Sequence, residues 1–125
     1  MTYKQFRKSV SKRGLEVADV VFGMSGIMPK VGRIWTTPGG ESYYDPNTKV
    51  VSVSALQADF VLQKLGVKDD EDIDWVVAFM LAHEITHSVF GRSKTEHETS
   101  VFALDALVTC SIITKSNRDD LLQIF

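Results

Sequence analysis

The feature that most constrains the fold is a nearly continuous apolar stretch at residues 75–90, which reads WVVAFMLAHEITHSVF. A helix over this stretch is apolar on almost every face, and such a helix is stable only when other elements cover it. In a chain of 125 residues this predicts a single domain, 1–125, built around that helix. Gly91 would end the helix, and the acidic run at 69–74 is typical of a helix N-terminus.

The rest of the chain alternates between helical and extended patterns. Apolar residues at spacings of three and four predict a basic N-terminal helix from residue 3, with a possible break at Gly14. Alternating residues between turn signals predict short strands, and further helices follow. The predicted strands are 31–35, 41–44 and 49–54, and the predicted helices after them are 55–65, 75–90, a helix opening at 93 and 116–125. We therefore expect an α+β fold, with helices packed on a short, mainly antiparallel sheet of two or three strands.

Composition excludes several classes of protein. No apolar run approaches the length of a membrane span, and no signal-peptide pattern is visible. The lone cysteine, Cys110, is expected to be buried in a helix, and it permits neither an internal disulfide nor a cysteine-rich zinc site. A net charge of −2 gives no electrostatic attraction to nucleic acid. We expect a cytoplasmic protein that binds neither nucleic acid nor membrane.

The acidic run contains a D-x-D-x-D spacing, at Asp70, Asp72 and Asp74, that resembles the start of a calcium loop. An EF-hand loop needs glycine at its sixth position and glutamate at its twelfth. Trp75 and Leu81 stand at those positions. The acids are therefore interpreted as helix-capping residues rather than calcium ligands.

His83-Glu84-Ile-Thr-His87 is an H-E-x-x-H motif inside the apolar helix. Residues four apart lie on one face of a helix, so both imidazoles can reach one metal ion, and Glu84 can address a metal-activated water. Histidines and a glutamate are costly to bury without partners, which also favours a metal site. In the alternative, both histidines bond to backbone in the core and Glu84 forms a salt bridge.

A zinc ion held by two histidines needs a third protein ligand. The candidates are Glu96, His97 and Glu98, because histidine is missing from the later position that the metzincin pattern requires. Capping boxes at 93–96 and 95–98 offer a structural role for either glutamate. The interpretation preferred here has Glu96 as metal ligand and Glu98 as helix cap, with His97 and Glu98 as alternative ligands.

At this point the chain resembles the zincin metallopeptidases, and within them the small glutamate-zincin domains of the ImmA/IrrE type. The resemblance rests on the H-E-x-x-H helix, on E-x-E-T-S-V-F-A at 96–103, and on Y-D-P followed by a strand at 44–53. It implies a zinc cofactor and a peptide substrate lying along a sheet edge strand. The pair Thr99-Ser100 replaces the family's usual Ala-Asn, which leaves open what supports the ligand histidines.

The function predicted from these features is that of a zinc-dependent metallopeptidase that hydrolyses a peptide bond in one or few protein partners. Glu84 is the predicted general base. The predicted oxyanion donor is one of four residues: Arg33, Tyr43, Tyr44 or His97. The alternative is a non-catalytic zinc-binding or protein-interaction domain of zincin-like shape. Small proteins of this kind would suit a phage or prophage setting.

Overall fold

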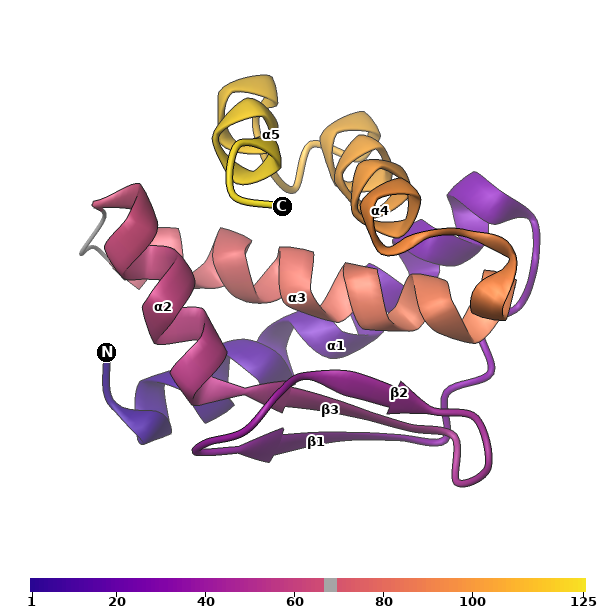
Figure 1. The fold of residues 1–125 in the computed structure, drawn as a ribbon, viewed down its shortest axis with the longest axis horizontal. Coiled ribbons are helices and arrows are strands. Elements are labelled where there is room, and N and C mark those ends of the chain that lie inside the picture. Colours follow the sequence, from indigo (N-terminus) through magenta and orange to yellow (C-terminus); the bar gives the residue numbers. More distant parts are fainter. Residues whose placement is uncertain (67–69) are drawn as a thin grey trace.

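The structure, a computed structural model, describes residues 1–66 and 70–125. It has an α+β fold, as predicted (Figure 1). The elements in chain order are α1 (Tyr3–Ser25), β1 (Arg33–Thr37), β2 (Tyr43–Asp45), β3 (Val50–Ser54), α2 (Ala55–Leu65), α3 (Asp70–Phe90), the short 3-10 helix η1 (Gly91–Ser93), α4 (Glu96–Thr109) and α5 (Lys115–Leu122).

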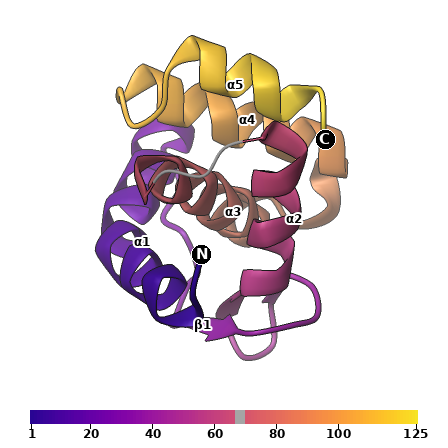
Figure 2. The ribbon, with the colours of Figure 1, turned by 90° about the vertical axis from the view of Figure 1, so that its left-hand side faces the viewer.

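The apolar helix α3 lies in the middle of the molecule. Figure 2 shows it with α1 and α2 on either side and α4 and α5 across its top. It packs against α1, α2 and α4, and against β2 and β3. Val76, Val77 and Ala78, which point in different directions around the helix, are all fully buried. The predicted central position of this helix is confirmed, because no face of it could be left in water.

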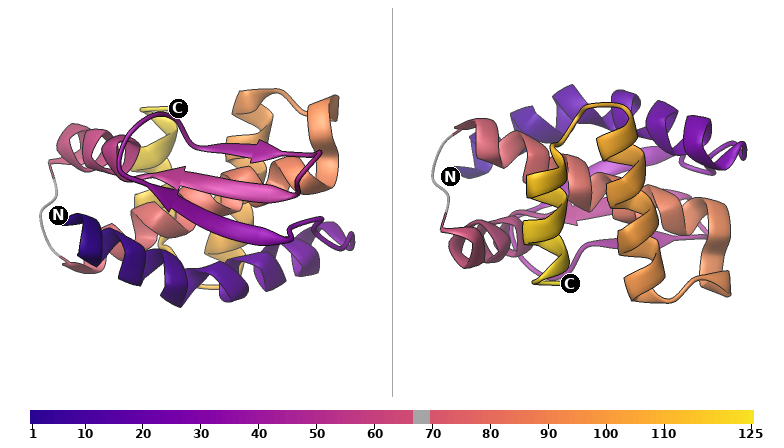
Figure 3. Two further views of the ribbon diagram at one scale, coloured as in Figure 1. Left: turned by 90° about the horizontal axis from the view of Figure 1, so that it is seen from below. Right: turned by 90° about the horizontal axis from the view of Figure 1, so that it is seen from above.

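The sheet is mixed rather than mainly antiparallel. Its strand order is β1-β3-β2, with β1 parallel to β3 and β2 antiparallel to it. The predicted strands are present, but β1 does not pair with β2. An alternating strand pattern marks which face is buried and does not encode the direction of the neighbouring strand. One face of the sheet packs under α1 and α3, and Figure 3 (left) shows the other face with no helix in front of it.

The acidic run lies at the start of α3, as predicted, and also makes side-chain contacts that were not predicted. The helix begins at Asp70 rather than at residue 75, so Asp72 and Asp74 lie inside it; Asp69 lies outside the described residues. Asp72 accepts a hydrogen bond from the Trp75 indole. Asp74 accepts bonds from Ser9 and Lys12 of α1, at 2.6 and 3.0 Å. The run therefore joins α3 to α1 instead of only capping a helix.

Two further differences come from tertiary contacts. Helix α1 runs unbroken through Gly14. The glycine lets the helix lie close to β1, since a Cβ at this residue would lie only 3.0 Å from Cδ1 of Ile34. The predicted burial of Cys110 is wrong: α4 ends at Thr109, and the cysteine is the exposed C-cap. Among the described helices, none combines the length and apolar character needed to cross a membrane.

Candidate metal centre

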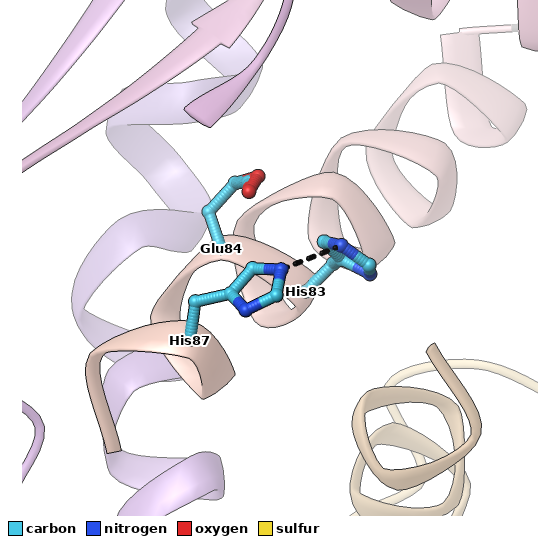
Figure 4. A group of neighbouring side chains, drawn as sticks. All are labelled: His83, Glu84 and His87. Carbon is cyan, nitrogen blue, oxygen red and sulfur yellow. Dashed lines mark hydrogen bonds between the residues drawn. The ribbon is translucent and has the colours of Figure 1, made fainter. Parts of the chain in front are cut away.

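Helix α3 presents His83, Glu84 and His87 together. Each offers a ligand atom, and these atoms all lie within 4.8 Å of one another, so the group could hold a metal ion. Figure 4 shows the two imidazoles side by side and Glu84 on a different side of the helix. The Nε2 atoms of the histidines are 3.2 Å apart. The spacing of four residues thus brings both rings to one point, as the sequence predicted.

The carboxylate of Glu96 lies against both rings. Its Oε2 is 2.9 Å from Nε2 of His83, and its Oε1 is 3.0 Å from Nε2 of His87. Glu96 is the first residue of α4, and α4 packs across α3. The N-terminus of α4 therefore places this carboxylate beside the histidine pair.

The two alternative ligands are engaged elsewhere. Thr95 and Glu98 form a capping box, in which each side chain bonds to the backbone N–H of the other residue. The hydrogen bonds to Thr95 hold the pKa of Glu98 below its usual value. His97 donates its Nδ1–H to the carbonyl oxygen of Phe125 over 3.3 Å. Of the three candidates, Glu96 alone has both oxygens within 3.0 Å of a histidine nitrogen.

Ser100 supports the first histidine. Its hydroxyl lies 3.0 Å from Nδ1 of His83, and the serine is 2% exposed. It follows Glu96 by one helical turn, so the same face of α4 carries both contacts. The serine therefore provides a hydrogen-bonding partner for the ring.

The tautomer of His83 decides whether this group favours a positive charge among its polar atoms. When Nδ1 of His83 donates to Ser100, its Nε2 carries a lone pair that faces the Glu96 carboxylate and the other imidazole. A proton or a metal ion would remove the repulsion. Burial and the neighbouring His87 lower the pKa of His83 despite the Glu96 carboxylate, which disfavours the proton. Among the residues that the structure describes, neither ring is hydrogen-bonded to a backbone atom, which the core-histidine alternative requires.

Glu84 is 5% exposed, yet it lines the cleft in front of the histidines. Burial raises its pKa to about 8, and the nearby Glu96 carboxylate adds to the shift. A buried carboxyl with a raised pKa is typical of groups that exchange protons during catalysis.

The cleft has a volume of about 1030 Å³. Strand β2 is an edge of the sheet and lines it with both tyrosines, and the other walls come from α2, α3, η1, the start of α4 and Phe125. Tyr43 is half-exposed there, whereas the Tyr44 hydroxyl donates to the carbonyl of Lys30 over 2.6 Å. Arg33 lies on β1, at the opposite edge, and is absent from the lining. Of the predicted oxyanion donors, Tyr43, Tyr44 and His97 line the cleft, and the Tyr44 hydroxyl and Nδ1 of His97 already donate to backbone carbonyls.

Two features of the site were missed in the sequence. The role of Ser100 was not predicted, although its position one turn after Glu96 signalled it. The contact of Phe125 with His97 has no local signal, because the two residues are 28 positions apart. No protein-family model, curated protein or solved structure matches this chain.

Proposed function

We propose that this protein is a zinc-dependent peptidase that uses His83, His87 and Glu96 as ligands and Glu84 as general base. The observation that carries the proposal is the convergence of two imidazole nitrogens and a carboxylate, at separations of 2.9 to 3.2 Å. A tetrahedral shell with zinc bonds of about 2.0–2.1 Å separates neighbouring ligand atoms by about 3.3 Å. Nitrogen and carboxylate donors without cysteine suit zinc.

Glu84 is assigned as the general base rather than as a metal ligand because its side chain does not point the same way as the two histidine rings. It precedes His87 by three residues and follows His83 by one, and it lies on a different side of the helix from the paired rings (Figure 4). A carboxylate beside the metal ligands can take a proton from a water in the cleft and return it to the leaving amine. When bound, zinc would supply a Lewis acid that lowers the pKa of a water toward about 7 and polarises the peptide carbonyl.

The shape of the cleft favours a peptide as substrate. Strand β2 has β3 on one side only, so its other edge is open for pairing with an extended chain. An extended peptide that adds to a sheet edge gains main-chain hydrogen bonds and places alternate side chains in the cleft. Tyr43 and Tyr44 of the same strand line the cleft, which brings such a peptide close to Glu84.

The test combines metal analysis with cleavage of candidate protein partners. We expect one zinc per chain in wild type and in Glu84→Gln, with cleavage abolished in Glu84→Gln because only the base is lost. Glu41→Gln, which changes another carboxylate lining the cleft, is the matched control and should retain cleavage. Cleavage by Glu84→Gln at the wild-type rate would overturn the role of Glu84. Zinc binding without cleavage of any peptide would support the non-catalytic alternative, and failure to bind zinc would overturn both.

A further inference from the structure

The residues after α5 return to the metal centre. Leu121, at the end of α5, is fully buried, and Ile124 packs against the core. Figure 1 shows this end of the chain lying over α3. Phe125 then reaches the cleft and forms part of its wall.

Phe125 is held in the cleft by two contacts. Its ring packs on Phe79 with ring centroids 5.0 Å apart, and its carbonyl oxygen accepts the Nδ1–H of His97. Phe79 lies one helical turn before His83, and the centroids of those two rings are 6.1 Å apart. His97 is adjacent to Glu96 in the chain. Both contacts are therefore made with immediate neighbours of the proposed zinc ligands.

These two contacts are the ones that a residue of a bound peptide could make. An aromatic side chain can stack on Phe79, and any peptide residue has a carbonyl that can accept from His97. Phe125 is still 37% exposed, and its hydrogen bond, at 3.3 Å, is long. A partly exposed residue held by one ring contact and one long hydrogen bond can be displaced by a ligand that offers the same groups.

We propose that Phe79 and His97 form a subsite for an aromatic residue of the peptide, and that Phe125 occupies this subsite in the resting protein. The proposal rests on the proposed function, because it assigns the subsite to a peptide substrate. It predicts competition: a peptide with phenylalanine must displace Phe125 before it can bind. Removal of the Phe125 ring would make the subsite permanently available.

The test measures peptide binding without turnover. The probes are fluorescein-labelled Ala-Ala-Phe-Ala-Ala and the same peptide with alanine in place of phenylalanine. Both are titrated by fluorescence anisotropy against the zinc-loaded Glu84→Gln protein, with and without Phe125→Ala. If Phe125 fills the subsite nine-tenths of the time, its removal should tighten binding of the phenylalanine probe about tenfold. The alanine probe should bind weakly to both proteins.

Two variants serve as comparisons. Phe60→Ala removes an exposed phenylalanine of α2 that does not line the cleft, and it should leave both affinities unchanged. Phe125→Leu keeps an apolar side chain on Phe79 and should give an intermediate affinity even if the alanine variant is poorly folded. Equal binding of the phenylalanine probe with and without the Phe125 ring would overturn the proposal, as would equal binding of the two probes to Phe125→Ala.

The result of the subsite test can be separated from the result of the peptidase test. If the wild-type protein cleaves no peptide but Phe125→Ala binds the phenylalanine probe more tightly, the subsite stands and the peptidase assignment fails. If peptides are cleaved and Phe125→Ala changes neither affinity nor kcat/KM, the peptidase assignment stands and the subsite fails.

Discussion

The hydroxyl of Ser100 lies 3.0 Å from Nδ1 of His83, so a residue of α4 fixes the ring of a residue of α3. With Nδ1–H donated to this hydroxyl, Nε2 keeps its lone pair and faces Glu96 and His87. A partner on the far ring nitrogen sets the tautomer of a metal-binding histidine and orients it. In the tautomer whose Nδ1–H donates to Ser100, His83 turns an unprotonated nitrogen toward Glu96 and His87, as a metal ligand must.

Replacing this serine should weaken zinc binding. In Ser100→Ala the His83 ring loses its partner, and zinc affinity should fall about 10- to 100-fold. Competition with a chelator of known affinity measures the effect. Ser116→Ala, at an exposed position of α5, is the control and should bind zinc as wild type does. An unchanged affinity in Ser100→Ala would show that the hydroxyl is dispensable.

The two glutamates at the start of α4 should separate into different roles. Glu96→Ala removes the carboxylate between the histidines and should abolish tight zinc binding while the helix cap remains. Glu98→Ala breaks the capping box with Thr95 and should lower stability while zinc binding remains. Zinc titration and urea unfolding of both variants check the prediction. Loss of zinc binding in Glu98→Ala with retention in Glu96→Ala would reverse the assignment.

In the metal-free protein, the burial of Glu84 should make the free energy of unfolding depend on pH. With a pKa of about 8, mainly from burial, the folded chain holds this proton between pH 4.5 and 8, whereas the unfolded chain releases it. The folded state therefore binds more protons in this window, and stability falls as pH rises through it. Glu84→Gln has no carboxyl group to ionise, so it does not lose stability in this way. The difference in free energy of unfolding between Glu84→Gln and wild type should therefore grow from pH 5 to pH 8, to at most about 5 kcal/mol.

Urea unfolding in a chelator, at several pH values, measures this difference directly. Wild-type and Glu84→Gln proteins are compared at each pH, so titrations elsewhere in the chain cancel. A difference that stays constant from pH 5 to pH 8 would mean that the carboxyl ionises normally in the metal-free fold.

The contact of Asp74 in α3 with Ser9 and Lys12 in α1 should make stability depend on pH in the opposite direction. Burial would raise the pKa of Asp74, but hydrogen bonds from Ser9 and Lys12 and the charges of Lys12 and Arg13 lower it overall. The ionised Asp74 carboxylate therefore stabilises the folded chain above the unfolded pKa of 3.8. This stabilisation is lost as pH falls from there through the lower pKa of the folded chain. Asp74→Asn should cost about 1 kcal/mol near neutral pH, since the pair is partly solvated.

Thermal unfolding between pH 3 and pH 7 tests this link. Asp19→Asn, on the exposed side of α1, is the control and should behave as wild type. If Asp74→Asn keeps the wild-type acid sensitivity, the link does not contribute to it.

Features encoded within a few residues could be predicted from the sequence. The spacing of His83 and His87 follows from the helical repeat, and the box of Thr95 and Glu98 is set by residues three apart. The strands were also predictable, because their alternating patterns are local. The parallel pairing of β1 with β3 was not, since it depends on the path of the chain over residues 38–49.

The sequence by itself determined that α3 must be central and that its two histidines share a face, because one apolar helix has to be covered and its repeat is fixed. Only the tertiary structure decided which carboxylate meets those histidines. The packing of α4 across α3 brings Glu96 and Ser100 to the rings. The return of the chain after α5 places Phe125 on Phe79. These contacts join residues 9 to 46 positions apart, so they depend on how helices dock rather than on how each one forms.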